Sequence, residues 1–233
     1  RVADSRARTF GIQARHYVDN PEFYLMQARA LVAMQKNPAN SIAHYEQLLA
    51  SNTQQTEAAR YGLALSYLKQ QKYSDARSEL SHLLKARPDY IPYIYASIEI
   101  DIAEQQYTKA LSALEPQLAL NFNNYPLLVL KAEALWGAHR YDEAAEILNQ
   151  LRQQRPEDPH IWYKLAEVRG LAGDISGVHE ARAEYFILVG ALDRARKQLG
   201  LAAKLVDADF KRSSVVKQRL RDIAGMQERL ERL

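Results

Sequence analysis

The pattern of apolar and polar positions is that of amphipathic helices, and one version of it occurs more than once. In YGLALSYLKQQKYSDARSEL (Tyr61–Leu80), alanine and leucine recur at helical spacing around a tyrosine–polar–Asp–Ala step. KAEALWGAHRYDEAAEIL (Lys131–Leu148) ends on the same Y-x-x-A-x-x-x-L pattern. The pattern predicts short helices in pairs, and therefore an all-α fold.

The alanine of this step sets a regular period. Ala76, Ala110 and Ala144 follow one another at equal intervals, and the next interval ends at Val178. The interval is that of the tetratricopeptide (TPR) repeat, a helix–turn–helix unit of about 34 residues. The chain therefore resembles a TPR solenoid of antiparallel helix pairs, helix A followed by helix B, with extra terminal helices.

The residue types at fixed places in each unit agree with this interpretation. Small side chains allow helices A and B to approach closely, and they recur at Ala64, Ala76, Ala132, Ala144 and Ala166. Pro88 and Pro156 follow helix B and cannot continue it. The third unit matches least well, because Asp101 stands at its aromatic position.

Three segments are expected along the chain. Residues 1–20 would be the end of a preceding helix and a linker, and residues 21–190 a TPR array of about five units. The first unit, Phe23–Ala50, is degenerate, with Ala43 in the place of the repeated alanine. Residues 191–233 would hold a half-unit and capping helices.

The C-terminal segment departs from the period. Ala195 lies only half a period after Val178, so one helix is expected to serve as B of one unit and A of the next. The last helix carries an apolar stripe made of Val216, Leu220, Ile223, Met226, Leu230 and Leu233. It is either a cap on the array or on another domain, or a coiled-coil or partner-binding helix.

Composition excludes several classes of function. The chain has no cysteine, which excludes disulfides, thiolate metal sites and cysteine nucleophiles. Its net charge of +3 does not indicate a nucleic-acid binder, and no apolar run is long enough for a transmembrane segment. The first residue is not methionine, so a piece of a longer protein is expected.

No constellation of residues indicates catalysis or metal binding in this chain. Zinc peptidases of the His-Glu-x-x-His type need two histidines on one helix face, whereas HEARA has Ala183 in place of the second. The other histidines are scattered singly at positions 16, 44, 82, 139 and 160. The glycines of GLAGDISG fit a turn between helices A and B, because the lysine of a phosphate loop is missing.

Two ends of the chain carry a more specific resemblance. RVADSRAR at residues 1–8 resembles the last helix of an M48-type zinc metalloprotease domain, with Ser5 in place of an alanine. PEFYLMQARAL (Pro21–Leu31) and HEARAEYFILVGALDRARKQL (His179–Leu199) resemble segments of the β-barrel assembly-enhancing protease (BepA) family. The chain is thus similar to the C-terminal TPR region of that family.

The resemblance implies a setting that the composition does not. The parent protein would be a periplasmic zinc endopeptidase and chaperone of a Gram-negative bacterium, with the zinc in the protease domain outside this chain. The TPR region would contact its own protease domain, the outer-membrane β-barrel assembly machinery and substrate β-barrel proteins. The alternative is a generic TPR scaffold of a different fusion, or a cytoplasmic regulator, without catalysis.

TPR arrays usually bind partners with the concave face, which exposed positions of the A helices line. One such position carries Tyr61, Tyr95, Val129 and Tyr163, and a second carries Leu65, Glu99, Glu133 and Glu167, with Trp136 one turn later. The candidate partner-binding residues are therefore Tyr61, Tyr95, Glu99, Glu133, Trp136, Tyr163 and Glu167. Together they would suit an extended peptide or β-hairpin with aromatic and basic side chains.

Two alternatives stay open for the surface. The tyrosines can instead pack between A helices and the glutamates can simply be solvated. Tyrosine and glutamate at these positions argue against a ligand that offers a C-terminal carboxylate there, because like charges repel.

The C-terminal stretch contains a second candidate surface, which is basic. It is either a solvated face, a surface for anionic lipid or nucleic acid, or a docking face for the protease domain. It comprises Arg194, Arg196, Lys197, Lys211, Arg212, Lys217, Arg219 and Arg221.

Overall fold

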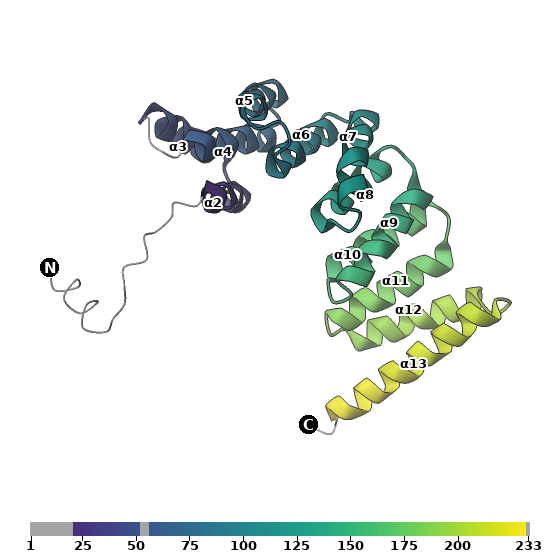
Figure 1. The fold of residues 1–233 in the computed structure, drawn as a ribbon. Coiled ribbons are helices and arrows are strands. Elements are labelled where there is room, and N and C mark those ends of the chain that lie inside the picture. Colours follow the sequence, from purple (N-terminus) through teal and green to yellow (C-terminus); the bar gives the residue numbers. More distant parts are fainter. Residues whose placement is uncertain (1–20, 52–55, 232–233) are drawn as a thin grey trace, which may run out of the picture. The chain divides into compact units, whose positions relative to one another are not determined.

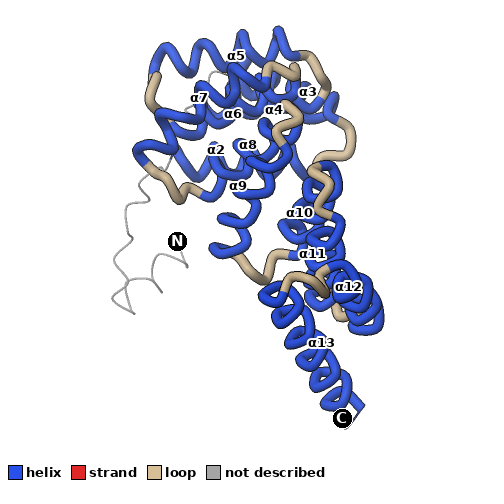
Figure 2. Tube along the Cα trace, turned by 90° about the vertical axis from the view of Figure 1, so that its right-hand side faces the viewer, coloured by secondary structure: helices blue, strands red, loops and turns tan. Residues whose placement is uncertain are grey.

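The computed structural model describes residues 21–51 and 56–231, and within those ranges it consists of helices and contains no strand (Figures 1 and 2). The all-α prediction is confirmed. The segment that resembles a protease helix, together with the expected linker over residues 1–20, lies outside the described residues. The same is true of Leu233, the last member of the apolar stripe.

The helices follow one another with short connections. Their bounds are α2 (Pro21–Met34), α3 (Pro38–Ala50), α4 (Thr56–Lys69), α5 (Tyr73–Ala86), α6 (Ile91–Ala103), α7 (Tyr107–Leu120), α8 (Tyr125–Gly137), α9 (Tyr141–Gln154), α10 (Pro159–Leu171), α11 (Ile175–Leu188), α12 (Leu192–Leu205) and α13 (Phe210–Glu231). Helices α4, α6, α8 and α10 are the predicted A helices, and each is followed by its B helix.

The chain separates into two compact units, the first ending at Ala96 and the second beginning at Ser97, within α6. In the first unit, α4 packs against α2, α3 and α5. In the second unit, each helix from α7 to α13 packs against the next one along the chain, as Figure 1 shows. Each unit is therefore a stack of neighbours, the packing expected of a repeat array.

The small residues of the repeat are buried where the helices of a pair meet. Ala76, Ala110 and Ala144 are completely inaccessible to solvent. Leu148 and Leu165 fill the space beside Ala144 in the core of the second unit. A larger side chain at the alanine positions would separate the two helices, which explains the residue type found there.

One backbone turn joins helices A and B from α4 onward. Its central residue is left-handed in all five copies, at Gln71 (φ 62°), Gln105 (φ 60°), His139 (φ 61°), Gly173 (φ 82°) and Gly190 (φ 77°). The residue after it donates its amide to a carbonyl five positions earlier, as in the Schellman motif. The last two copies are half a period apart, so α11 closes one repeat and opens the next, as the spacing of Ala195 predicted.

The alignment of the first, degenerate unit was wrong by two residues. Ala43 is exposed, whereas Ser41 is fully buried at the fourth position of α3, the place that Ala76 takes in α5. The Ser41 hydroxyl donates to the Pro38 carbonyl at 2.9 Å, which satisfies the buried group. The position is set by where the helix starts after Asn37, its N-cap, and not by a constant period.

Asp101, the exception in the third unit, is 2 % exposed. Its Oδ1 lies 2.9 Å from Nζ of Lys109 on α7. The pair joins helices A and B of that unit at the position that Tyr67 takes in the second unit. Asp101 is therefore a structural residue with a charged partner, which a buried carboxylate requires.

The C-terminal helix α13 is a cap on the array. Val216 and Ile223 are buried and pack against α12 and the end of α11, together with Leu220. Leu230, near the end of the same stripe, is 62 % exposed. The middle of the predicted stripe thus covers the last repeat, and its C-terminal end remains accessible.

Candidate functional site

Three of the predicted partner-binding residues meet in one groove of the second compact unit. Glu133 and Trp136 from α8 and Glu167 from α10 line a cavity of about 200 Å³. Further lining residues come from the same two helices, the end of α9 and the turn before α10. The cavity therefore lies between successive A helices, where the repeat pattern placed the binding face. We call it the α8–α10 groove.

The floor of the groove is apolar and its rim carries charge. Ile161 is only 5 % exposed and Val129 is half-buried, whereas the Trp136 side chain is 49 % exposed. On the rim, Nζ of Lys164 donates to Oε1 of Glu133 at 2.9 Å. Both partners are solvated, so this ion pair contributes at most about 1 kcal/mol to stability and a ligand can displace it. Glu167 is exposed beside them.

Tyr125 closes the other side of the groove. Its hydroxyl donates to Oδ2 of Asp158 at 3.3 Å, and the guanidinium of Arg155 lies 3.9 Å from its ring centroid. Burial and the neighbouring Asp158 carboxylate raise the pKa of Tyr125, so the phenol remains a neutral hydrogen-bond donor. The edge of the groove is thus held in place by contacts to the hydroxyl and to the ring of one aromatic side chain.

Tyr163 lies outside the groove, although it is on α10. It is 52 % exposed, and its ring packs edge-on against Tyr185 of α11 with centroids 5.8 Å apart. It therefore offers an aromatic surface on the neighbouring pair of helices. Whether it contacts a partner stays a prediction.

The first compact unit holds Tyr61 and Tyr95 in a cluster around Arg29 of α2. Nη2 of Arg29 donates to the Tyr61 hydroxyl at 2.7 Å, and its guanidinium lies 4.7 Å from the Tyr95 ring centroid. Tyr61 is completely buried, so it has the packing role of the alternative interpretation, and Leu65 is buried as well. Tyr95 is half-buried.

Glu99 is partly exposed on α6 and is not among the residues that line the groove. Partner binding by Tyr95 and Glu99 stays a prediction. The groove also contains residues that the sequence did not single out, among them Lys164 and His160. No periodic signal marks Lys164, because the residue one period earlier is Leu130.

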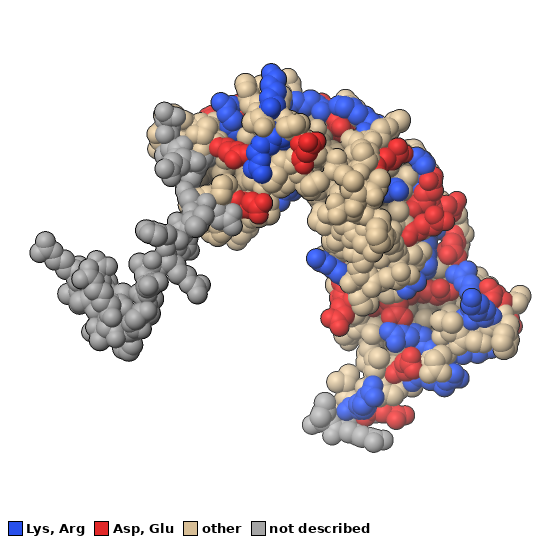
Figure 3. All heavy atoms as spheres, in the orientation of Figure 1, with Lys and Arg blue, Asp and Glu red and all other residues tan. Residues whose placement is uncertain are grey.

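Part of the basic C-terminal stretch is engaged in ion pairs with α11 and the turn that precedes it. Nη2 of Arg212 lies 2.9 Å from Oε1 of Glu180 and 3.3 Å from Oδ1 of Asp174. Arg219 makes a two-point contact with Glu184. Arg212 and Arg219 therefore fasten α13 to the array. Figure 3 shows positive and negative side chains mixed over the C-terminal helices, and a broad uncharged area over α8.

His179 of the HEARA segment makes an ordinary structural contact. Its Nδ1 lies 2.7 Å from Oε1 of Gln198 on α12. Across residues 21–51 and 56–231, no three histidine, aspartate or glutamate side chains gather in a way that could hold a metal ion. None of the helices in those ranges combines the length and apolar character that crossing a bilayer requires.

Comparison with known protein families supports the repeat assignment. Models of the tetratricopeptide repeat match residues 25–91 and residues 101–168. A thermophilic TPR protein from Thermus thermophilus has the same fold, with a TM-score of 0.53 and 20 % identity over 88 % of this chain and 99 % of that one. The TPR solenoid predicted from the sequence is confirmed.

Curated relatives match most of the length of the chain. The β-barrel assembly-enhancing protease of Escherichia coli (strain K12) is 29 % identical over 99 % of this chain and 47 % of its own length. The protein of the same name in Yersinia pestis is 26 % identical over 84 % of this chain and 40 % of its own length. The chain thus spans about half the length, or less, of the curated relatives it matches.

Proposed function

We propose that this chain, a tetratricopeptide-repeat homologue of the β-barrel assembly-enhancing proteases, recruits protein partners through the α8–α10 groove. The single observation that carries the proposal is Trp136. A half-exposed tryptophan beside an apolar cavity leaves a large apolar area in contact with water. Residues of this kind often contribute most of the binding free energy of protein interfaces.

The chemistry of the groove indicates the kind of partner segment. The apolar floor suits an aromatic or aliphatic side chain, which would stack on Trp136. Glu167 and Glu133 on the rim suit a basic side chain next to it, and binding would then release Lys164 from Glu133. A strand or hairpin in which apolar and basic residues alternate meets both demands.

The names of the relatives suggest the setting. We place the chain in a longer periplasmic protease and chaperone, where it would bind the outer-membrane β-barrel assembly machinery and unassembled β-barrel proteins. The chain itself contributes binding and no bond cleavage. The zinc and the catalytic residues of such an enzyme would belong to a protease domain outside this chain, with which the repeats would pack.

The direct test is binding of an unassembled outer-membrane β-barrel. The purified chain would be titrated into a fluorescently labelled barrel protein that has been freshly diluted from urea. Trp136→Ala should weaken binding at least about tenfold, because a hot-spot aromatic contributes about 2 kcal/mol or more. Glu167→Gln should weaken it less and make it less sensitive to salt.

Phe122→Ala is the matched control, because Phe122 is a 71 % exposed aromatic in the turn before α8 and does not line the groove. It should bind as the unaltered chain does. Equal losses in both variants would show that any exposed aromatic suffices, and would overturn the assignment of the groove. No binding of the barrel by the unaltered chain would favour a generic scaffold of a different fusion.

A further inference from the structure

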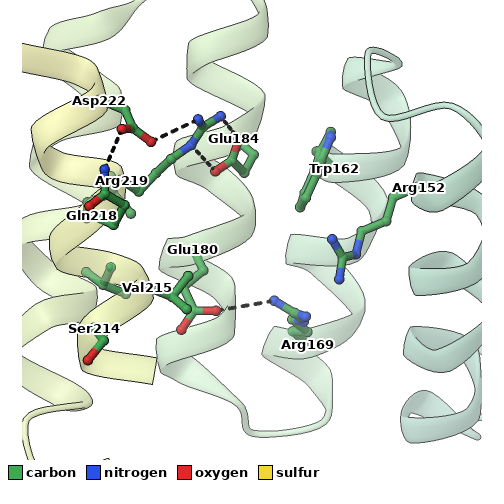
Figure 4. Close-up of a pocket in the computed structure, with 12 residues that line it drawn as sticks. Arg152, Trp162, Arg169, Glu180, Glu184, Ser214, Val215, Gln218, Arg219 and Asp222 are labelled. Atoms are coloured by element: carbon green, nitrogen blue, oxygen red, sulfur yellow. Dashed lines mark hydrogen bonds and ion pairs between the residues drawn. The ribbon is translucent and has the colours of Figure 1, made fainter. Parts of the chain in front are cut away.

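A second, larger cavity of about 510 Å³ lies in the C-terminal half of the array, among α9, α10, α11 and α13 (Figure 4). It is separate from the α8–α10 groove, with which it has no lining residue in common. One wall carries Arg152, Trp162 and Arg169, and the opposite wall carries Glu184, Arg219 and Asp222. We call the first of these the arginine wall.

The positive charge of Arg169 on α10 is only weakly balanced by nearby carboxylates. Its side chain is only 17 % exposed, and its closest carboxylate oxygens, on Asp174 and Glu180, are 3.9 Å and 4.0 Å away. Its hydrogen bonds to the Gly177 carbonyl and to Oδ1 of Asn149 are long, at 3.2 Å and 3.4 Å. Burial lowers the pKa of Arg169; the carboxylates of Asp174 and Glu180 oppose this shift, and the charges of Arg152 and Arg212 add to it.

Arg152 on α9 is the second cation of this wall. Its guanidinium lies 5.2 Å from the Trp162 ring centroid, and its Nε donates to Oδ1 of Asn149 at 2.8 Å. Throughout residues 21–51 and 56–231, no carboxylate comes within ion-pair distance of it. Figure 4 shows its guanidinium turned toward Arg169. The two guanidiniums therefore converge on one neutral acceptor, Oδ1 of Asn149, and the carboxylates near Arg169 lie only at 3.9 Å and 4.0 Å.

The acidic residues of the opposite wall, Glu184 and Asp222, are held by Arg219 of α13. Arg219 contacts Glu184 through two hydrogen bonds of 2.7 Å and 2.6 Å, and also lies 3.5 Å from Asp222. Glu180 lies 2.9 Å from Arg212 and 4.0 Å from Arg169, so its charge is held mainly by Arg212. Glu184 and Asp222 are paired with Arg219, and the arginine wall is therefore only partly neutralised.

We propose that this cavity binds a peptide through one carboxylate, held between Arg152 and Arg169, with an apolar side chain against Trp162. The two guanidiniums supply the forked donors that a carboxylate accepts. Trp162 and Val215, which is 64 % exposed, supply the apolar surface beside them. A dianionic phosphate fits less well, because Asp174 and Glu180 already lie 3.9 Å and 4.0 Å from Arg169 and would repel a second negative charge.

The carboxylate can come from a chain terminus or from a glutamate side chain, and the two share the same chemistry. The groove on α8 and α10 is different, since its rim carries Glu133 and Glu167. The array would therefore hold two sites of opposite charge preference. A single extended partner could place a basic segment in one and an acidic or terminal segment in the other.

Three fluorescein-labelled peptides with one common apolar body test the proposal by fluorescence anisotropy with the purified chain. The first ends in phenylalanine with a free carboxylate. The second is amidated and contains one internal glutamate, and the third is amidated with no acidic residue. The first or the second should bind at least about tenfold more tightly than the third, since a charge-assisted bond contributes about 1.5 kcal/mol or more. The preferred peptide identifies the source of the carboxylate.

Arg152→Gln should remove this preference, because it deletes one of the two guanidiniums; Arg152 is half-buried but is not part of the apolar core, and folding would be checked by circular dichroism. Arg196→Gln on α12 is the matched control, an exposed arginine outside the cavity, and should keep the preference. Arg169→Lys retains the charge without the fork and should weaken binding severalfold, with folding checked by circular dichroism.

Three results would each overturn the proposal. The first is equal binding of all three peptides, and the second is unchanged binding by Arg152→Gln. The third is no binding of any peptide at protein concentrations up to about 1 mM, because a specific contact of this kind should have a dissociation constant below that value. Since the peptides carry no basic residue, their failure would leave the α8–α10 groove and its test unaffected.

Discussion

The guanidinium of Arg219 on α13 meets the carboxylate of Glu184 on α11 in a two-point contact, with Nε to Oε1 at 2.7 Å and Nη2 to Oε2 at 2.6 Å. The two side chains are 32 % and 22 % exposed, so water screens the pair only in part. The contact joins residues 35 positions apart and fixes the C-terminal helix on the last repeat.

Arg219→Gln should lower the free energy of unfolding by about 1–2 kcal/mol, because it leaves Glu184 without its charged partner. Urea denaturation followed by circular dichroism measures this. Hydrogen exchange should show the largest loss of protection in α13. The control is Arg221→Gln, since Arg221, among the described residues, donates only to Gln218 on its own helix. If the two variants lose the same stability, the pair does not hold α13.

The Asp174 carboxylate should make the free energy of unfolding of the array depend on pH in the acid range. Burial alone would raise the pKa of its carboxyl, but the Gly177 amide, the Ser176 hydroxyl and the Arg212 guanidinium outweigh burial and hold the pKa below the ordinary 3.8. The unfolded chain then takes up the proton at a higher pH than the folded chain. The stability from this group is present above about pH 5 and is lost as the pH falls through the folded-state pKa.

Asp174→Asn keeps a good helix cap and removes the charge. Its melting temperature should be below that of the unaltered chain at neutral pH, and the gap should close as the pH is lowered past 3.8. Thermal melts across this range measure the difference. A gap that stays constant with pH would show that the Asp174 charge makes no contribution.

Two glycines within helices should respond in opposite ways to alanine. A Cβ on Gly62 of α4 would collide with the ring of Tyr45, whereas a Cβ on Gly200 of α12 would meet open space. Gly62→Ala should therefore cost about 1–3 kcal/mol through overpacking. Gly200→Ala should stabilise by about 0.5–1 kcal/mol through helix propensity. Denaturant midpoints test both, and a stabilising Gly62→Ala would contradict the packing of α3 on α4.

At the left-handed position of the repeated turn, exchanging glycine with another residue should change the folding stability through the backbone angle alone. Gly190→Ala places a side chain at φ 77° with no steric neighbour, and should cost about 1 kcal/mol. Gln71→Gly relieves φ 62° at the equivalent turn, and should stabilise by a few tenths of a kcal/mol after the entropy of the unfolded chain is counted. Chemical denaturation of both variants checks the prediction. A stabilising Gly190→Ala or a destabilising Gln71→Gly would contradict it.

Periodicity predicted those features that repeat. The small residues at Ala76, Ala110 and Ala144 are buried because identical helix pairs place them identically, and their equal spacing is visible without a structure. The half-period at Ala195 was visible for the same reason. Ser41 escaped prediction, because the first B helix starts after its own cap and shifts the small position by two residues.

Periodicity did not predict what covers each repeated position. Tyr61 and Tyr163 occupy the same place in their units, yet Tyr61 is buried under Arg29 and Tyr163 is half-exposed. The neighbours come from other helices whose side chains do not repeat. The arginine wall of the second cavity escaped notice likewise. Arg169 occupies the repeat position of Tyr67 and Asp101 but not their residue type, and Arg152 lies on a different helix, so no periodic pattern joins the two.

The central claim is that the array binds its partners through the surface around Trp136, and this claim is tested most directly in cells. A photoreactive phenylalanine derivative, which keeps an aromatic ring, would replace Trp136 in a protein that carries this chain, expressed in a Gram-negative bacterium, with position 122 as the matched exposed control. The account predicts crosslinks from position 136 to outer-membrane β-barrel proteins or their assembly machinery, and few from position 122. Crosslinks of equal strength from both positions, or from position 122 alone, would contradict it.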